Sequence, residues 1–149
     1  KAGARVMDLQ SPDNKMSKST SGDSGIVYLL DEPAAIGRKF KRAVTDSGSD
    51  VVYDRANKPG VANLLEILAA ATNTTPEAAA AQFSQYGALK AATGAAVVEM
   101  LAPIRSRYHE LMNDRGELAR LVRRGDDRAE QVAAATLARA HAAIGMLPR

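Results

Sequence analysis

The sequence contains no cysteine, and aromatic residues occupy only 4% of its 149 positions. The absence of cysteine excludes disulfides and thiolate metal sites, and it is common in proteins of the reducing cytoplasm. The shortage of aromatic residues leaves alanine to supply much of the 46% hydrophobic fraction. Such a composition favours closely packed helices of small residues over a β-sandwich.

Long hydrophobic runs are also missing. No stretch of about 18 apolar residues occurs, so we expect no membrane-spanning segment. The N-terminal residues lack the basic-then-apolar pattern of a secretory signal. With the missing cysteine, these features predict a cytoplasmic protein without a membrane partner. The net charge of +3 permits an anionic partner such as RNA without identifying one.

Metal ligands are scarce as well. The only histidines are His109 and His141, and both fall on predicted helices without paired ligands. A structural or catalytic zinc ion needs three or four converging ligands. Asp126-Asp127 fits the start of a helix better than a metal site. We therefore predict no metal site formed by this chain.

The most distinctive stretch that is present is Lys15-Met16-Ser17-Lys18-Ser19, called the cationic loop below. It combines two ammonium groups with hydroxyl side chains, and the Gly- and Ser-rich stretch at 20–25 that follows favours no regular element. Lysine suits the binding of a moving polyphosphate, because its charge rides on a flexible stem. Backbone N–H groups of such a loop add further donors. The composition indicates a phosphate-binding loop, with a solvated surface loop as the alternative.

Most of the remaining sequence predicts helices joined by short loops. Residues 3–9 form a predicted strand, which would need a sheet partner from outside this chain, and residues 26–30 are expected to be extended or a single turn. Pro33 and Pro76 fit the first position of a helix, and Thr75 fits the N-cap before Pro76. Gly125 fits the end of one helix and Asp126 the start of the last. Helices are expected over residues 33–45, 61–72, 76–83, 88–112, 115–124 and 126–146.

The longest predicted helix carries one continuous apolar seam. Val97, Leu101, Ile104, Tyr108 and Leu111 follow one another at steps of three and four. This spacing predicts a packing face along the whole helix. Pro103 lies inside the helix and predicts a kink there.

Basic residues gather on several predicted helices. Four of them fall within five positions, and others follow near the C-terminus. They are candidates for contacts with an RNA backbone, and a solvated helix face is the alternative. Two tyrosines are candidates for base stacking. These positions are Arg38, Lys39, Lys41, Arg42, Arg105, Arg107, Arg120, Arg123 and Arg124, together with Tyr86 and Tyr108.

Gly3-Ala4-Arg5-Val6-Met7-Asp8-Leu9 and the cationic loop resemble the second signature of class I aminoacyl-tRNA synthetases and the strand before it. Three further stretches resemble the bacterial tryptophanyl-tRNA synthetase family. They are Ala43-Val44-Thr45-Asp46-Ser47, Asn57-Lys58-Pro59-Gly60-Val61-Ala62-Asn63-Leu64-Leu65 and Pro103-Ile104-Arg105-Ser106-Arg107-Tyr108. The resemblance covers nearly the whole chain, but the family's His-containing phosphate motif and its tryptophan pocket are absent from this sequence. Because the sequence also begins at Lys1 rather than at a methionine, we expect a processed chain or a part of a longer one.

The resemblance implies that residues 1–32 end a Rossmann-type α/β catalytic domain with its last strand. Residues 33–149 would then form a helical anticodon-binding domain, so that the chain is mainly α. The implied enzyme is a cytoplasmic, homodimeric tryptophan–tRNA ligase, which activates tryptophan with ATP and Mg²⁺ and transfers it to tRNA(Trp). This chain alone is expected to be inactive. The alternatives are a tyrosyl-tRNA synthetase and a non-catalytic helical RNA-binding module.

The resemblance also implies a role for each residue of the cationic loop. Lys15 and Lys18 would be catalytic, since they would bind the β- and γ-phosphates as charge builds on the leaving pyrophosphate. Ser17 and Ser19 would bind phosphate oxygens or shape the loop. The remaining implied contacts, to adenine, come from the backbone of Met16 and from Val6.

Overall fold

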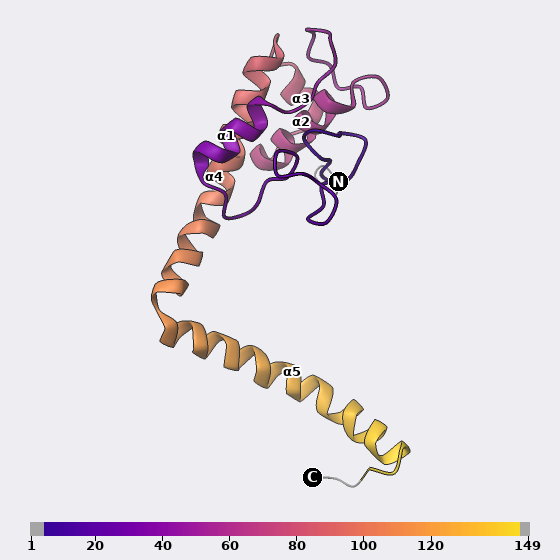
Figure 1. Cartoon of the computed structure of the whole chain (residues 1–149), viewed down its shortest axis with the longest axis vertical. Helices are drawn as coiled ribbons and strands as arrows, with labels where there is room; N and C mark the ends of the chain where they lie inside the picture. Colours follow the sequence, from indigo (N-terminus) through magenta and orange to yellow (C-terminus); the bar gives the residue numbers. More distant parts are fainter. Residues whose placement is uncertain (1–4, 147–149) are drawn as a thin grey trace. The chain divides into compact units, whose positions relative to one another are not determined.

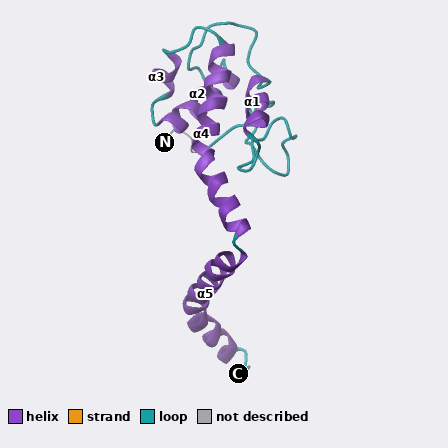
Figure 2. Cartoon of the chain, turned by 90° about the vertical axis from the view of Figure 1, so that its left-hand side faces the viewer, coloured by secondary structure: helices purple, strands orange, loops and turns teal. Residues whose placement is uncertain are grey.

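Three of the five helices in the described part of the chain begin at proline: the starts at Pro33 and Pro76 were predicted, whereas the helix that begins at Pro59 was predicted to begin at Val61. The structure is a computed structural model that describes residues 5–146. Its helices are α1 (Pro33–Lys41), α2 (Pro59–Thr72), α3 (Pro76–Ala80), α4 (Tyr86–Asn113) and α5 (Arg115–Ala143) (Figures 1 and 2). Proline favours the first helical position because its fixed φ suits the helix and its missing N–H would have no partner there. The prediction of a mainly α fold is confirmed.

The chain divides into two compact units, residues 1–105 and 106–149. Helix α2 forms the core of the first unit, where the ten consecutive residues Gly60 to Ala69 are all buried. Phe40 from α1 and Leu89 from α4 belong to the same buried cluster. The helical bundle prediction therefore holds for α1 to α4 in the first unit.

The first turn of α2 packs against the backbone at Val44. A Cβ atom added at Gly60 would collide with the Val44 carbonyl oxygen and approach Thr45 Cα within 3.2 Å. We expect Gly60→Ala to lower the free energy of unfolding by about 2 kcal/mol, because a backbone neighbour cannot move as a flexible side chain can. Denaturant unfolding measures this change.

A matched control for Gly60→Ala is Gly37→Ala in helix α1, where an added Cβ meets no atom within 4 Å. This substitution should be neutral or stabilise by up to about 1 kcal/mol, since alanine is the better helix former. Equal unfolding midpoints for the two variants would contradict the close contact at Gly60.

The predicted strand at residues 3–9 is wrong for its described part. Gly3 and Ala4 lie outside the described residues, and the segment from Val6 to Leu9 forms only an isolated antiparallel bridge, between Met7 and Lys15. Its backbone groups bond to several separate segments instead of one neighbouring strand. Asn14, Met16 and Gly25 supply backbone partners, at 2.8–3.0 Å.

Helix α1 ends earlier than the predicted Thr45. Its last residue is Lys41, and the chain then turns away from the helix axis. The Val44 N–H donates to the carbonyl of Leu9 at 2.7 Å, so a tertiary hydrogen bond replaces the next helical one. Helix α3 also ends early, at Ala80 rather than Phe83. Its predicted N-cap is confirmed, since Thr75 Oγ1 accepts from the Ala78 N–H at 3.2 Å.

The apolar seam of α4 is confirmed in its first half only. Val97 and Leu101 are buried, whereas Ile104 is 46% exposed and Tyr108 is 40% exposed. Pro103 lies within the helix as predicted, and the kink remains a prediction. By length and composition alone α4 could cross a membrane, but a core helix passes the same test. Leu89 and Val97 place its first half in the core of the first unit.

The predicted break at Gly125 is wrong, because α5 is one helix from Arg115 to Ala143. Asp126 therefore lies inside a helix rather than at an N-cap. A single glycine in a helix interior costs only about 1 kcal/mol, which the strong helix formers around it can offset. The predicted cap at Asp114 is confirmed, since its carboxylate accepts from the Glu117 N–H at 2.9 Å. No residue described in α5 is buried, so the bundle prediction finds no support there.

Candidate functional site

The cationic loop follows a tight turn that pairs Lys15 with Met7. The Asn14 N–H donates to the carbonyl of Ser11 at 2.8 Å, which closes a turn over Pro12 and Asp13. The Met16 N–H donates to the Val6 carbonyl at 3.0 Å on the far side of the bridge. Val6 and Met16, the two implied adenine contacts, are therefore neighbours and are both half-buried.

The side chain of Asn63 in helix α2 supplies the second partner of Met7. Asn63 Oδ1 accepts from the Met7 N–H, and its Nδ2 donates to the Met7 carbonyl, both at 3.0 Å. In this bridge the N–H and carbonyl groups of Met7 point away from Lys15. The Asn63 amide therefore supplies the two hydrogen bonds that a second neighbouring strand would otherwise make. The sequence placed Asn63 in a family-like stretch but gave no hint of this contact.

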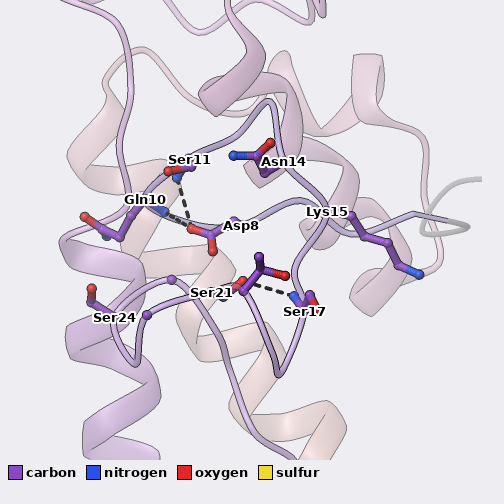
Figure 3. A pocket seen from close by; sticks show the side chains of 11 residues that line it. Asp8, Gln10, Ser11, Asn14, Lys15, Ser17, Ser21 and Ser24 are labelled. Atoms are coloured by element: carbon purple, nitrogen blue, oxygen red, sulfur yellow. Dashed lines mark hydrogen bonds between the residues drawn. The ribbon is translucent and has the colours of Figure 1, made fainter.

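A cavity of about 490 Å³ lies beside the cationic loop (Figure 3). Its lining is dominated by hydroxyl and amide groups, with one carboxylate and one ammonium group. Lys15 and Ser17 line it, whereas Val6, Met16, Lys18 and Ser19 do not. The lining residues are Asp8, Gln10, Ser11, Asn14, Lys15, Ser17, Thr20, Ser21, Gly22, Ser24 and Gly25.

Internal hydrogen bonds shape the cationic loop. The Ser17 N–H donates to Ser21 Oγ at 3.0 Å, and the Ser21 N–H donates to the Ser17 carbonyl at 2.9 Å. The hydroxyls of Ser17 and Ser19 lie 3.1 Å apart. Lys18 is therefore carried by a closed turn with hydroxyl groups on either side.

The ammonium groups of Lys15 and Lys18 are exposed. Within residues 5–146, neither lies within 4.0 Å of a carboxylate oxygen. Cations without an internal counter-ion attract anions, and a lysine on a hydroxyl-rich turn is suited to phosphate oxygens. Both ammonium groups are therefore available to an anion, and phosphate binding by the loop stays a prediction.

The buried carboxylate of Asp8 anchors the base of the cavity and was not identified from the sequence. Its Oδ1 accepts from the N–H groups of Gln10 at 2.7 Å and Ser11 at 3.0 Å. Burial opposes ionisation, but hydrogen bonds from the Ser21 hydroxyl and these amides hold the pKa of Asp8 below its usual value. A Cβ atom at Gly25 would collide with this carboxylate, so the close approach requires glycine. A short apolar run followed by Asp and a Pro-Asp turn is the signal that could have indicated it.

A second polar cluster joins two of the family-like stretches. Lys58 Nζ donates to the Tyr86 hydroxyl and to Asp50 Oδ1, both at 3.0 Å, and the Tyr86 hydroxyl donates to Asp46 at 2.8 Å. The hydrogen bonds to Tyr86 and Asp50 raise the pKa of Lys58, and the Tyr86 hydroxyl lowers that of Asp46. Tyr86 is thus engaged in a structural network, which makes it a poor base-stacking candidate. Tyr108 stays exposed.

The cationic run on helix α1 does not form one continuous surface. Arg38, Lys41 and Arg42 are exposed, but Lys39 is only 8% exposed. Lys39 Nζ lies 2.9 Å from Asp31 Oδ2 and 3.4 Å from Asp23 Oδ1. Burial lowers the pKa of Lys39, yet the two carboxylates outweigh it and the pKa lies above its usual value. The prediction of Lys39 as a surface cation is therefore wrong.

The part of the chain that the structure describes holds no group of three His, Asp or Glu side chains able to bind a metal ion. His109 is exposed and packs edge-on against Tyr108, with 5.5 Å between the ring centroids. Near the cationic loop, Asp8 is a single carboxylate and its Oδ1 is already occupied by two amides.

Comparison with known proteins places these features in a family. Residues 3–102 match the family described as tRNA synthetases class I (W and Y). The tryptophan–tRNA ligase 1 of Streptomyces coelicolor is 52% identical, over 97% of this chain and 43% of that protein. The tryptophan–tRNA ligase of Leifsonia xyli is 46% identical, over 99% of this chain and 44% of that protein. The chain thus spans less than half the length of these relatives.

A solved structure agrees with the sequence relatives. The crystal structure of tryptophanyl-tRNA synthetase from Mycoplasma pneumoniae matches with a TM-score of 0.84 and 29% sequence identity, over 99% of this chain and 45% of that one. The family match covers the cationic loop, the cluster around Lys58 and most of helix α4. The chain belongs to the family of class I tRNA synthetases for tryptophan and tyrosine.

Proposed function

We propose that this chain is the C-terminal part of a tryptophan–tRNA ligase, which activates tryptophan with ATP and transfers it to tRNA(Trp). One observation carries the proposal. Relatives that are 52% and 46% identical over at least 97% of the chain are both named tryptophan–tRNA ligases. The family itself includes tyrosine enzymes, but these relatives favour tryptophan.

In the proposed reaction, the cationic loop acts on the phosphates of MgATP. The tryptophan carboxylate attacks the α-phosphorus, and pyrophosphate leaves with the charge that develops on it. Lys15 and Lys18 stabilise that charge at the β- and γ-phosphates, and such preorganised cations lower barriers most in a closed, dry site. The exposed, uncompensated ammonium groups support this role. Ser17 and Ser19 bind phosphate oxygens.

Val6 and the backbone of Met16 hold the adenine ring in this proposal. Their hydrogen bond and half-burial make a fixed, largely apolar edge beside the loop. Because the catalysis consists of positioning and charge stabilisation, no general base is needed from this chain. The tryptophan pocket and the other phosphate-binding motif would come from the remainder of the enzyme, so the chain alone would be inactive.

The domain boundary and the partners belong to the same proposal. Residues 1–32 would close the Rossmann-type catalytic domain, and residues 33–149 would form the anticodon-binding domain. Pro33 begins helix α1, so the proposed boundary falls between two segments of the compact unit formed by residues 1–105. The exposed cations Arg38, Lys41 and Arg42 are candidates for tRNA backbone contacts. The enzyme would work in the cytoplasm as a homodimer.

Amino-acid-dependent exchange of pyrophosphate into ATP tests the proposal on the full-length enzyme. We expect exchange with tryptophan and at most a trace with tyrosine, because a site built for one side chain rejects the other strongly. Exchange that depends on tyrosine would assign the chain to the other branch of the family. No exchange with either amino acid would refute the enzymatic proposal.

A further inference from the structure

The segment that leaves the cationic loop is held by a lysine of helix α1. Asp23 lies four residues after Ser19, and its Oδ1 is 3.4 Å from Lys39 Nζ. The same ammonium lies 2.9 Å from Asp31 Oδ2 and 5.1 Å from the centre of the Tyr28 ring. One side chain of α1 therefore contacts three points along the segment between the loop and the helix.

The two ion pairs of Lys39 differ in exposure. The Asp31 side chain is 17% exposed and also accepts from the Tyr28 N–H at 3.0 Å, so this pair is enclosed and fixes the turn before α1. The Asp23 side chain is 84% exposed, and its pair with Lys39 is longer. Exposed pairs contribute little to the stability of the fold, whereas removing one partner of an enclosed pair is costly. The Asp23 contact is thus not needed for folding.

Other contacts fix the loop at its base, and the Ser21 hydroxyl bonds to the buried Asp8 carboxylate, but none of these contacts joins residues 17–24 to a helix. The Met16 N–H bonds to Val6 at the loop entrance, and the Leu9 N–H bonds to the Gly25 carbonyl after the loop, at 2.9 Å. Among the residues that the structure describes between Met16 and Gly25, only Asp23 forms an ion pair with a helix, through Lys39. It restricts where the turn carrying Lys18 can lie.

We propose that Lys39 and Asp23 are positioning residues for the cationic loop, which tie the phosphate-binding lysines to helix α1 through an exposed ion pair. This inference rests on the proposed function of the loop. Restricting the loop before ATP arrives lowers the entropy lost when the lysines engage the phosphates. Asp23 carries a negative charge close to an anion site, which simple electrostatics would disfavour, so its benefit must come through geometry.

The test compares Asp23→Asn with Asp13→Asn in the full-length enzyme. Asp13 is an exposed carboxylate of the turn before the loop. Both substitutions remove one negative charge near the loop, and charge alone would therefore lower the KM for ATP in both. We expect Asp23→Asn to raise the KM for ATP roughly two- to fivefold, as an exposed ion pair permits. Its melting temperature should stay unchanged.

Two further measurements test whether Asp23 acts by holding the loop in place. Asp23→Glu keeps the charge and reaches at least as far, so it should restore the wild-type KM. Amide hydrogen exchange in residues 17–25 should be faster in Asp23→Asn than in Asp13→Asn, because the segment loses its tether. A lowered or unchanged KM in Asp23→Asn, or a clearly lowered melting temperature, would overturn the positioning role. If the unmodified enzyme shows no tryptophan-dependent exchange, the proposed function itself fails, which is a separate result.

Discussion

Lys18→Ala in the full-length enzyme is expected to slow tryptophan-dependent ATP–pyrophosphate exchange by about two to three orders of magnitude, corresponding to about 3–4 kcal/mol of lost transition-state stabilisation. The Lys18 ammonium is exposed on the turn closed by Ser17 and Ser21, so its removal disturbs no packing. The effect should appear mainly in kcat, because the charge on pyrophosphate builds as the bond breaks. Initial rates of exchange at saturating tryptophan measure it.

The matched control is Lys41→Ala, which removes another exposed lysine, from helix α1. The exchange reaction involves no tRNA, so a lysine that contacts only the tRNA backbone should leave its rate unchanged. Both variants should melt at the wild-type temperature, since surface substitutions change stability by about 0.5 kcal/mol or less. Wild-type exchange by Lys18→Ala would remove this lysine from the catalytic site.

Asn63→Ala is expected to lower the free energy of unfolding by about 3 kcal/mol, because it leaves two partly buried backbone groups of Met7 without their side-chain partners. The Asn63 side chain is 3% exposed, and both of its hydrogen bonds are 3.0 Å long. A cavity of about 170 Å³ borders Met7 and Asn63, so water can recover part of the lost bonding and keeps the cost below that of a fully buried site. Denaturant unfolding of the full-length enzyme measures the loss.

Two further variants, Asn63→Asp and Asn57→Ala, make this test specific. Asn63→Asp keeps the acceptor for the Met7 N–H but loses the donor to the Met7 carbonyl, so it should also be clearly destabilised. Asn57→Ala loses only an exposed bond to Asp54, of 2.7 Å, and should cost less than about 1 kcal/mol. If Asn63→Ala were as stable as Asn57→Ala, the side chain would not support the Met7 segment.

The sequence alone determined the local features of this protein. Proline at the first helical position and a threonine or aspartate cap predicted the starts of α1, α3 and α5, because these signals act within one helical turn. The sequence also predicted α2, as a helix over residues 61–72. The composition of the cationic loop predicted a phosphate-binding function, which remains a proposal.

The predicted helix ends were wrong where a local sequence signal and the tertiary contacts favour different ends. Gly125 and Asp126 resemble a helix boundary, but α5 continues through both. A glycine costs a helix only about 1 kcal/mol, so it ends one only when tertiary contacts favour another path. Such a contact exists after α1, where the Val44 N–H bonds to Leu9, and the helix stops before the predicted Thr45.

The tertiary structure alone decided which polar residues are internal. Lys39 stands in a run of four cations, and only its contacts with Asp31 and Asp23 distinguish it from its neighbours. Asn63 bonds to a residue 56 positions earlier, and Asp8 fits its place only because Gly25 has no side chain. Residue type sets what each group can bond to, but the folded chain selects the partner, since bonds between distant residues leave no periodicity in the sequence. The lysines of the cationic loop were therefore evident from the sequence, while the residues that hold the loop in place emerged only from the fold.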